Sequence, residues 1–250
     1  MDTSFIKGIL CDIGGVLYVG DTPYPGAIEA IHKLKAKFPV RFLTNTTQKT
    51  GAQVVEKLQK MGFDIDASEV ITALDVTKSY LQQNHSKAQF LLTDEAAAFF
   101  NDLPEAPDRY VVVGDAQENF SYQRLNEAFR LLMNGGELLA AANNRYFKDY
   151  DGELSMDAGP FVSALENASG KKAHIIGKPS CDFYHLACKS MGVDPQYTMM
   201  IGDDIQSDVL GAQQAGIKGI LVRTGKFSPK DLDGTIIPDL IVDSIADICL

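Results

Sequence analysis

The apolar residues of this chain fall into two patterns. Short continuous apolar runs are typical of buried parallel strands, and positions that repeat every three to four residues are typical of amphipathic helices. The runs predict strands near residues 6–12, 40–43, 89–92, 110–113, 138–142, 174–176, 198–201, 219–222 and 240–242. The repeating positions predict helices near residues 27–37, 51–61, 76–83, 95–100, 122–133, 161–169 and 181–191. Single helices between strands imply right-handed crossovers, so we expect an α/β fold with a doubly wound, Rossmann-like parallel sheet.

The alternation of strands and helices starts again after the second predicted helix. Residues from about 73 to 173 form a complete strand–helix series of their own, and the strand at 174–176 is expected to resume the first sheet. We therefore expect a core domain made of residues 1–72 and 174–250, interrupted by an inserted α/β domain at residues 73–173.

Composition and charge narrow the classes of function. A hydrophobic fraction of 45% with 22% charged residues is typical of a soluble globular protein. The net charge of −10 argues against nucleic acid or an anionic membrane as the main partner. We see no signal peptide or membrane span, and the spacing of Cys11, Cys181, Cys188 and Cys249 suits neither zinc nor a redox pair. A cytoplasmic protein with free thiols is expected.

The first strand ends at an acidic residue. Asp12 follows a buried apolar run and precedes Gly14 and Gly15, which let the backbone approach a ligand closely. Ligands of open parallel sheets bind beyond the carboxyl ends of the strands. Asp12 is thus placed as a nucleophile or metal ligand, although alone it would be read as a turn carboxylate.

Other strand ends carry polar residues of complementary kinds. In a doubly wound sheet these ends share one edge, so their side chains can converge although they are distant in sequence. Carboxylates, a lysine and small hydrogen-bonding groups suit a magnesium-assisted phosphoryl transfer, in which a carboxylate can form an aspartyl-phosphate. The residues are Asp12, Thr44, Asn45, Lys178, Asp203, Asp204 and Asp208.

Four motifs in a fixed order resemble those of the haloacid dehalogenase superfamily. They are Asp12-x-Gly-Gly-Val-Leu, Leu43-Thr-Asn45, Gly177-Lys-Pro179 and Gly202-Asp-Asp-x-x-x-Asp208. The resemblance covers nearly the whole chain. The insertion after the second motif is similar to the large C2 cap of subfamily IIA, which contains NagD-like and 4-nitrophenyl-phosphatase-like enzymes.

The resemblance implies a role for each matching position. Asp12 matches the nucleophile and a Mg²⁺ ligand, the Gly14 carbonyl and Asp203 match further Mg²⁺ ligands, and Lys178 matches the lysine that neutralises charge. Thr44, Asn45 and Thr46 match the phosphate-binding motif, although Asn45 could equally cap a helix. Asp204 and Asp208 match supporting positions, or else orient a helix N-terminus. In the insertion, Asn143, Asn144, Arg145 and Asp157 are candidates for substrate contact or for a solvated loop.

One position departs from the family pattern. Gly14 stands where the family has the Asp that acts as general acid and base, a contribution of about a hundred- to ten-thousand-fold in rate. The sequence thus predicts a magnesium-dependent phosphatase for small phosphorylated substrates such as aryl phosphates, P–N compounds or pyrophosphate. The alternative is a phosphate- and metal-binding protein with little turnover. Carbon–halogen or phosphonate hydrolysis is less favoured, and a homodimer is left open.

Overall fold

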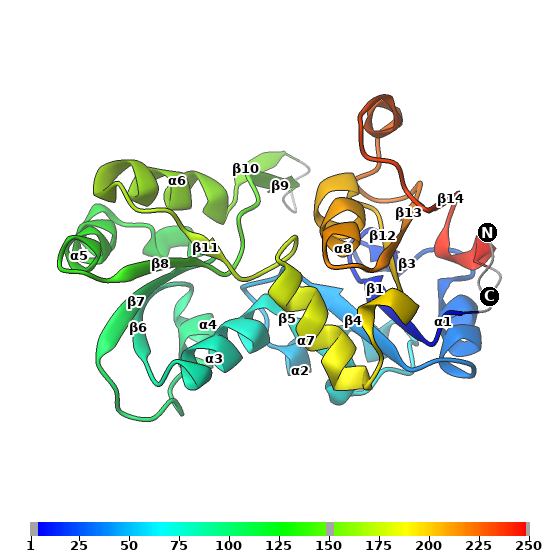
Figure 1. Cartoon of the computed structure of the whole chain (residues 1–250), viewed down its shortest axis with the longest axis horizontal. Helices are drawn as coiled ribbons and strands as arrows, with labels where there is room; N and C mark the ends of the chain where they lie inside the picture. Colours follow the sequence, from blue (N-terminus) through cyan, green and yellow to red (C-terminus); the bar gives the residue numbers. More distant parts are fainter. Residues whose placement is uncertain (1–4, 149–152, 249–250) are drawn as a thin grey trace. The chain divides into compact units, whose positions relative to one another are not determined.

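The computed structural model describes residues 5–148 and 153–248. The chain forms two compact units (Figure 1). The first unit contains the residues up to Thr44, residues Gly51–Ile71 and the residues from Lys178 onward, and the second contains Asn45–Thr50 and Thr72–Gly177.

A six-stranded sheet forms the centre of the first unit. Its order is β14-β13-β12-β1-β4-β5, and the pairs β1–β12, β1–β4, β12–β13 and β13–β14 are parallel. Numbered along the chain, this order is that of a doubly wound sheet, whose direction of winding reverses between β1 and β12. The expected fold class is confirmed. The strands are β1 (Gly8–Asp12), β4 (Val40–Thr44), β5 (Val70–Thr72), β12 (Thr198–Gly202), β13 (Lys218–Val222) and β14 (Leu240–Val242).

Helices cover both faces of this sheet. Side chains alternate between the two faces along each strand. One face, with Ile9 and Cys11 of β1, packs against α1 (Ala27–Lys35) and α2 (Gly51–Lys60). On the opposite face Leu221 packs against the π-helix η4 (Ile205–Leu210), which continues into α8 (Gly211–Gln214) beside α7 (Cys181–Met191). Two-sided cover explains why these strands are almost wholly apolar.

The second unit contains its own parallel sheet. The order is β11-β8-β7-β6, and the apolar faces of α5 and α6 pack on it. The strands are β6 (Lys87–Leu91), β7 (Asp108–Val113), β8 (Glu137–Ala140) and β11 (His174–Ile175). The helices are α3 (Ala73–Gln83), α4 (Asp94–Ala98), α5 (Tyr122–Met133) and α6 (Ala158–Ser169).

The expected place of the strand near 174–176 is wrong. This strand, β11, pairs with β8 in the second sheet instead of resuming the first sheet. A short apolar run shows that a strand is buried but carries no information about which sheet it joins. The second unit accordingly extends beyond the expected limits of 73–173 and also contains residues 45–50, 72 and 174–177.

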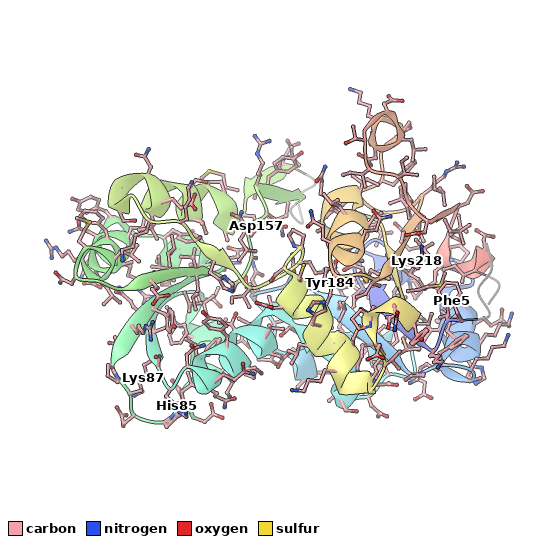
Figure 2. All side chains as sticks on the ribbon, in the orientation of Figure 1. Phe5, His85, Lys87, Asp157, Tyr184 and Lys218 are labelled. Atoms are coloured by element: carbon pink, nitrogen blue, oxygen red, sulfur yellow. The ribbon has the colours of Figure 1, made fainter. Side chains whose placement is uncertain are left out.

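Two helices begin earlier than predicted because of their caps. The helix expected near 161 is α6, which begins at Ala158, directly after Asp157 (Figure 2). The Asp157 carboxylate accepts a hydrogen bond from the Ala158 N–H at 2.7 Å. The helix expected near 76 is α3, which begins at Ala73. Thr72 and Asp75 form a reciprocal capping box at its start.

Several short elements were not predicted because they are too brief to show a periodic pattern. They are β2 (Tyr18–Val19), β3 (Thr22–Pro23), β5, β9 (Tyr146–Lys148), β10 (Leu154–Met156), η1 (Ala67–Glu69), η2 (Gln117–Asn119), η3 (Pro195–Tyr197), η5 (Pro229–Asp233) and η6 (Ile245–Asp247). The continuous helix formed by η4 and α8 was expected only as a helix N-terminus beside Asp204 and Asp208.

Cys11, Cys181 and Cys188 are free thiols, and Cys249 lies outside the described residues. Among the helices in residues 5–148 and 153–248, none combines the length and the apolar character needed to cross a bilayer.

We predict that Leu58→Ala destabilises the protein by about 2–5 kcal/mol, because it leaves a cavity between α2 and the sheet. Leu58 is fully buried in the first unit's core. The measurement is the midpoint of urea unfolding. Lys60→Ala, at an exposed position of the same helix, is the control and should leave the midpoint nearly unchanged. Equal midpoints for the two variants would contradict this account of the core.

Candidate active site

Two carboxylates lie at the point where the sheet changes its direction of winding. β1 and β12 are neighbours, and Cys11 pairs with Ile201, so Asp12 and Asp203 occupy or directly follow the carboxyl ends of adjacent strands. On the other side of β1, Asp12 pairs with Leu43 of β4, which places Thr44 at the same edge. This edge is where open α/β sheets bind ligands.

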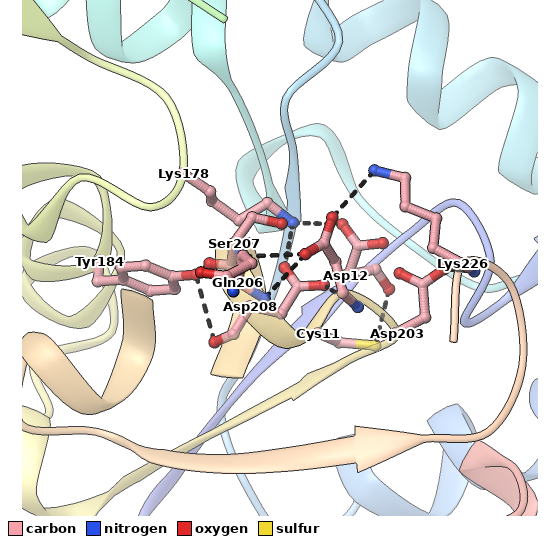
Figure 3. Close-up of polar contacts among 10 residues, drawn as sticks. Cys11, Asp12, Lys178, Tyr184, Asp203, Gln206, Ser207, Asp208 and Lys226 are labelled. Atoms are coloured by element: carbon pink, nitrogen blue, oxygen red, sulfur yellow. Dashed lines mark hydrogen bonds and ion pairs between the residues drawn. The ribbon is translucent and has the colours of Figure 1, made fainter. Parts of the chain in front are cut away.

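Lys178 joins two of the acids (Figure 3). Its Nζ lies 2.5 Å from Oδ1 of Asp12 and 2.7 Å from Oδ1 of Asp208, and only 4% of its side chain is exposed. The expectation that Lys178 follows a strand of this sheet is wrong, because the preceding strand belongs to the second unit. Lys178 instead enters from the connection before α7 and is then enclosed by the first unit's own carboxylates.

Asp204 and Asp208 both hold the π-helix that follows β12. Oδ1 of Asp204 accepts hydrogen bonds from the N–H groups of Gln206 and Ser207, each at 3.0 Å. The Asp204 N–H in turn donates to Oδ2 of Asp208 at 3.2 Å. The hydroxyl of Tyr184, a buried residue of α7, donates to the Ser207 carbonyl of the same turn. Both carboxylates therefore bind backbone groups at the start of this helix. These contacts are compatible with a supporting role at the site.

Backbone atoms of two loops pack closely around the Asp203 carboxylate. Its Oδ2 accepts a hydrogen bond from the Lys226 N–H at 2.6 Å. Gly15 and Gly225 have φ angles of +84° and +59°, and a Cβ on either would collide with the Asp203 carboxylate. Thr224 Oγ1 donates to the Gly15 carbonyl at 2.6 Å, which ties the two loops together. Only glycine combines this conformation with this close approach.

The Thr224–Lys226 loop was not among the candidate site residues. It acts on Asp203 through a backbone N–H, which has no residue-specific signature in a sequence. The available signal was the Gly225-Lys226 pair shortly after the predicted strand at 219–222, at the same sheet edge as Asp203.

The cluster carries more negative charge than its one buried lysine balances. Burial raises the pKa of Asp203, and the negative charges of Asp12 and Asp208 raise it further. Burial also raises the pKa of Asp208, although Lys178 opposes this. For Lys178, burial lowers the pKa, but the charges of Asp12 and Asp208 outweigh it and hold the ammonium protonated. Such a cluster would be stabilised by a further cation.

The arrangement of the acids fits a divalent metal ion. Asp12, Asp203 and Asp208 each offer a carboxylate oxygen, and these oxygens lie within 4.8 Å of one another. Both oxygens of Asp208 already accept hydrogen bonds from protein groups. Asp12 and Asp203 are therefore better suited to bind the ion directly, and their hard oxygen atoms are the ligands that Mg²⁺ prefers.

The three residues of the second motif are not held by the same unit. Thr44 ends β4 in the first unit, whereas Asn45 and Thr46 belong to the segment Asn45–Thr50, which groups with the second unit. That segment is fixed at Thr47, whose Oγ1 accepts a hydrogen bond from the Asp115 N–H at 2.8 Å. The phosphate-binding role of Thr44, Asn45 and Thr46 stays a prediction.

The candidate residues of the insertion lie around the start of α6. Asp157 is buried and caps the helix, and the Asn144 carbonyl accepts a hydrogen bond from the Gly159 N–H at 2.9 Å. Asn143 and Arg145 have exposed side chains beside them. Asp157 therefore has a structural role as the N-cap of α6. Substrate contact by these four residues stays a prediction.

We predict that Gly15→Ala costs about 1–3 kcal/mol of stability, because it combines a left-handed backbone with a clash against Asp203. Gly14→Ala is the matched control, since a Cβ there has no neighbour within 4 Å and the φ angle is ordinary. Urea unfolding of both variants measures the difference. If Gly14→Ala were the more damaging change, the described packing around Asp203 would be wrong.

Comparisons with known proteins agree with this geometry. Residues 9–103 match the haloacid dehalogenase-like hydrolase family, and residues 175–248 match a HAD-hydrolase-like family. The chain is 42% identical to haloacid dehalogenase-like hydrolase domain-containing protein 2 of Bos taurus, covering 91% of this chain and 88% of that protein. It is 40% identical to phospholysine phosphohistidine inorganic pyrophosphate phosphatase of Homo sapiens, covering 90% of this chain and 86% of that protein.

Solved structures show the same fold over nearly the whole chain. The 4-nitrophenylphosphatase of Thermotoga maritima superposes with a TM-score of 0.90 at 27% identity, covering 98% of this chain and 97% of that one. NagD from E. coli K-12 superposes with a TM-score of 0.89 at 27% identity, covering 98% of both chains. The resemblance predicted from the four motifs is thereby confirmed, and the chain belongs to the haloacid dehalogenase-like hydrolases.

Proposed function

We propose that this protein is a magnesium-dependent phosphatase that hydrolyses small phosphorylated substrates through an aspartyl-phosphate on Asp12. The observation that carries the proposal is the convergence of Asp12, Asp203 and the Lys178–Asp208 pair at the winding-reversal edge of the sheet. The related proteins named as phosphatases support the same class of reaction.

Asp12 is the proposed nucleophile. Its carboxylate oxygen would form a bond to phosphorus while the bond to the leaving group breaks and its electron pair departs with the leaving group. Water would then hydrolyse the acyl phosphate and restore Asp12. The ion pair with Lys178 holds the carboxylate in one orientation. Lys178 would also balance charge on the transferring group.

The remaining residues would bind the metal and the phosphate. Asp12, Asp203 and the Gly14 carbonyl would hold Mg²⁺, with Asp204 and Asp208 in support. When bound, Mg²⁺ would stabilise negative charge on the transferring phosphoryl group. Thr44, Asn45 and Thr46 would donate hydrogen bonds to the phosphate oxygens, in agreement with the place of Thr44 beside the end of β1.

We further propose that residues 73–173 form the core of a cap that selects substrates. Their separate parallel sheet and hydrophobic core support this assignment. The free thiols Cys11, Cys181 and Cys188 are compatible with a reducing compartment, and we place the enzyme in the cytoplasm.

The second candidate function is metal and phosphate binding with little turnover. Gly14 favours it, because the position is exposed and the first motif supplies no acid or base there. The two candidates differ in whether the bound phosphorylated compound is consumed.

We predict hydrolysis of 4-nitrophenyl phosphate and of pyrophosphate that requires Mg²⁺. Asp12→Asn should reduce turnover to background, because the amide is not a nucleophile, while the fold is retained. Release of phosphate measures turnover, and mass spectrometry of the trapped protein should find phosphorylated Asp12 in the natural chain alone. Binding of Mg²⁺ and phosphate without any turnover would favour the second candidate.

Gly14→Asp should raise turnover of alkyl phosphates by more than that of aryl phosphates. An alkoxide leaving group needs a proton, whereas a phenolate needs little help, and the general acid that the substitution restores is worth up to about a hundred- to ten-thousand-fold. The space around Gly14 accommodates the new side chain at its Cβ. Single-turnover rates over a series of leaving groups provide the measurement, with Gly14→Asn as the control of equal size. Rates that are independent of the leaving group in the natural chain would show that the proton comes from another residue.

A further inference from the structure

Two lysines accompany the acids of the site, and their surroundings differ. Lys178 is enclosed, with 4% of its side chain exposed and two short ion pairs. Lys226 has 62% of its side chain exposed, and among the described residues its ion pair is with Asp204, at the long distance of 3.4 Å. Lys178 is fixed, whereas the ammonium of Lys226 can exchange its present partner for an incoming anion.

The backbone that carries Lys226 is anchored at three points. Thr224 Oγ1 donates to the Gly15 carbonyl at 2.6 Å, and the Gly225 N–H donates to the Tyr24 hydroxyl at 3.2 Å. The Lys226 N–H donates to Asp203 Oδ2 at 2.6 Å. The side chain of Lys226 extends away from this anchored backbone beside Asp203 (Figure 3). Its ammonium lies 3.4 Å from Oδ2 of Asp204.

An in-line reaction places the leaving group on the side of phosphorus away from Asp12. The side chains of Asp12 and Lys178 are 12% and 4% exposed, so a substrate reaches Asp12 from solvent. In an in-line displacement the leaving group lies opposite the attacking oxygen. A leaving group that departs towards the exposed side of the cluster would meet the ammonium of Lys226 and the negative charge of Asp203 and Asp204.

We propose that Lys226 is a specificity-determining residue that binds the leaving group, and that it selects substrates whose leaving group carries its own negative charge. Inorganic pyrophosphate is the simplest such substrate. The inference rests on the proposed phosphatase function and on the juxtaposition of a pinned Lys226 backbone with an exposed ammonium beside the acid cluster.

The reaction with pyrophosphate balances without a general acid at position 14. Attack by the Asp12 carboxylate on HP₂O₇³⁻ forms the aspartyl-phosphate and breaks the P–O bond, and the electron pair leaves with HPO₄²⁻. Water then converts the aspartyl-phosphate into the free carboxylate and H₂PO₄⁻. The leaving phosphate needs no new proton but carries two charges beside carboxylates, and the Lys226 ammonium would offset this repulsion.

The test compares Lys226→Met with the natural chain on two substrates at fixed free Mg²⁺. The methionine keeps the backbone N–H that holds Asp203 and removes only the ammonium. We expect kcat/KM for pyrophosphate to fall by about tenfold to a hundredfold, the size of a lost charge-assisted hydrogen bond. For 4-nitrophenyl phosphate, which has no charged group beyond the phosphate, we expect a change of less than about threefold. Lys226→Arg should restore most of the pyrophosphate activity.

Two controls separate this inference from other effects. Lys230→Met removes an exposed lysine four residues further along the chain. It should leave kcat/KM unchanged for both substrates. The affinity for Mg²⁺, measured by calorimetry, should not be weaker in Lys226→Met. An equal loss on both substrates, or a weaker metal site, would overturn the inference. If the natural chain hydrolysed neither substrate, the proposed phosphatase function would fail first.

Discussion

The contact on which the site depends is the buried ammonium of Lys178 between the carboxylates of Asp12 and Asp208. Carboxylates gathered in a protein interior repel one another and lose hydration, so they remain ionised there only beside a compensating cation. Removing one partner of such a buried pair typically costs about 3–5 kcal/mol. Because Lys178 is the residue at which the chain re-enters the first unit, this ion pair also fixes where the connection from the second unit ends.

Around this ion pair, the precise positions of the acids are set mainly by backbone. Gly15 and Gly225 leave room for the Asp203 carboxylate, and Gly202 leaves room for Asp208, where a Cβ would overlap that side chain. The main-chain N–H of Lys226 holds one oxygen of Asp203, and the main-chain N–H of Asp204 holds one oxygen of Asp208. The side chains supply the chemistry, and the glycines and amides supply the geometry.

The sequence predicted those features that depend on burial and on strand ends. β12 and β13 were recognised because both faces of these strands are covered, and Asp12 and Asp203 were placed together because parallel strands end at one edge. The sheet that β11 joins could not be predicted, since a strand of only His174 and Ile175 fits the edge of either sheet. The loop at Lys226 was missed because a backbone donor is independent of residue type. The attachment of Thr47 to Asp115 was missed because it depends on tertiary contact.

The π-helical turn at Ile205–Leu210 has a consequence for how this site can change. The Asp204 carbonyl accepts hydrogen bonds from the N–H groups of both Asp208 and Val209, so this turn holds one residue more than a regular α-helical turn. Deleting a single residue between Asp204 and Asp208 would shorten their spacing from four residues to three, and would turn Asp208 by about 100° around the helix axis relative to Asp204. Asp208 would leave Lys178 even though every functional side chain was still encoded. At this place the spacing between residues is as much a part of the site as their identity, and a search for the acids alone would overlook its loss.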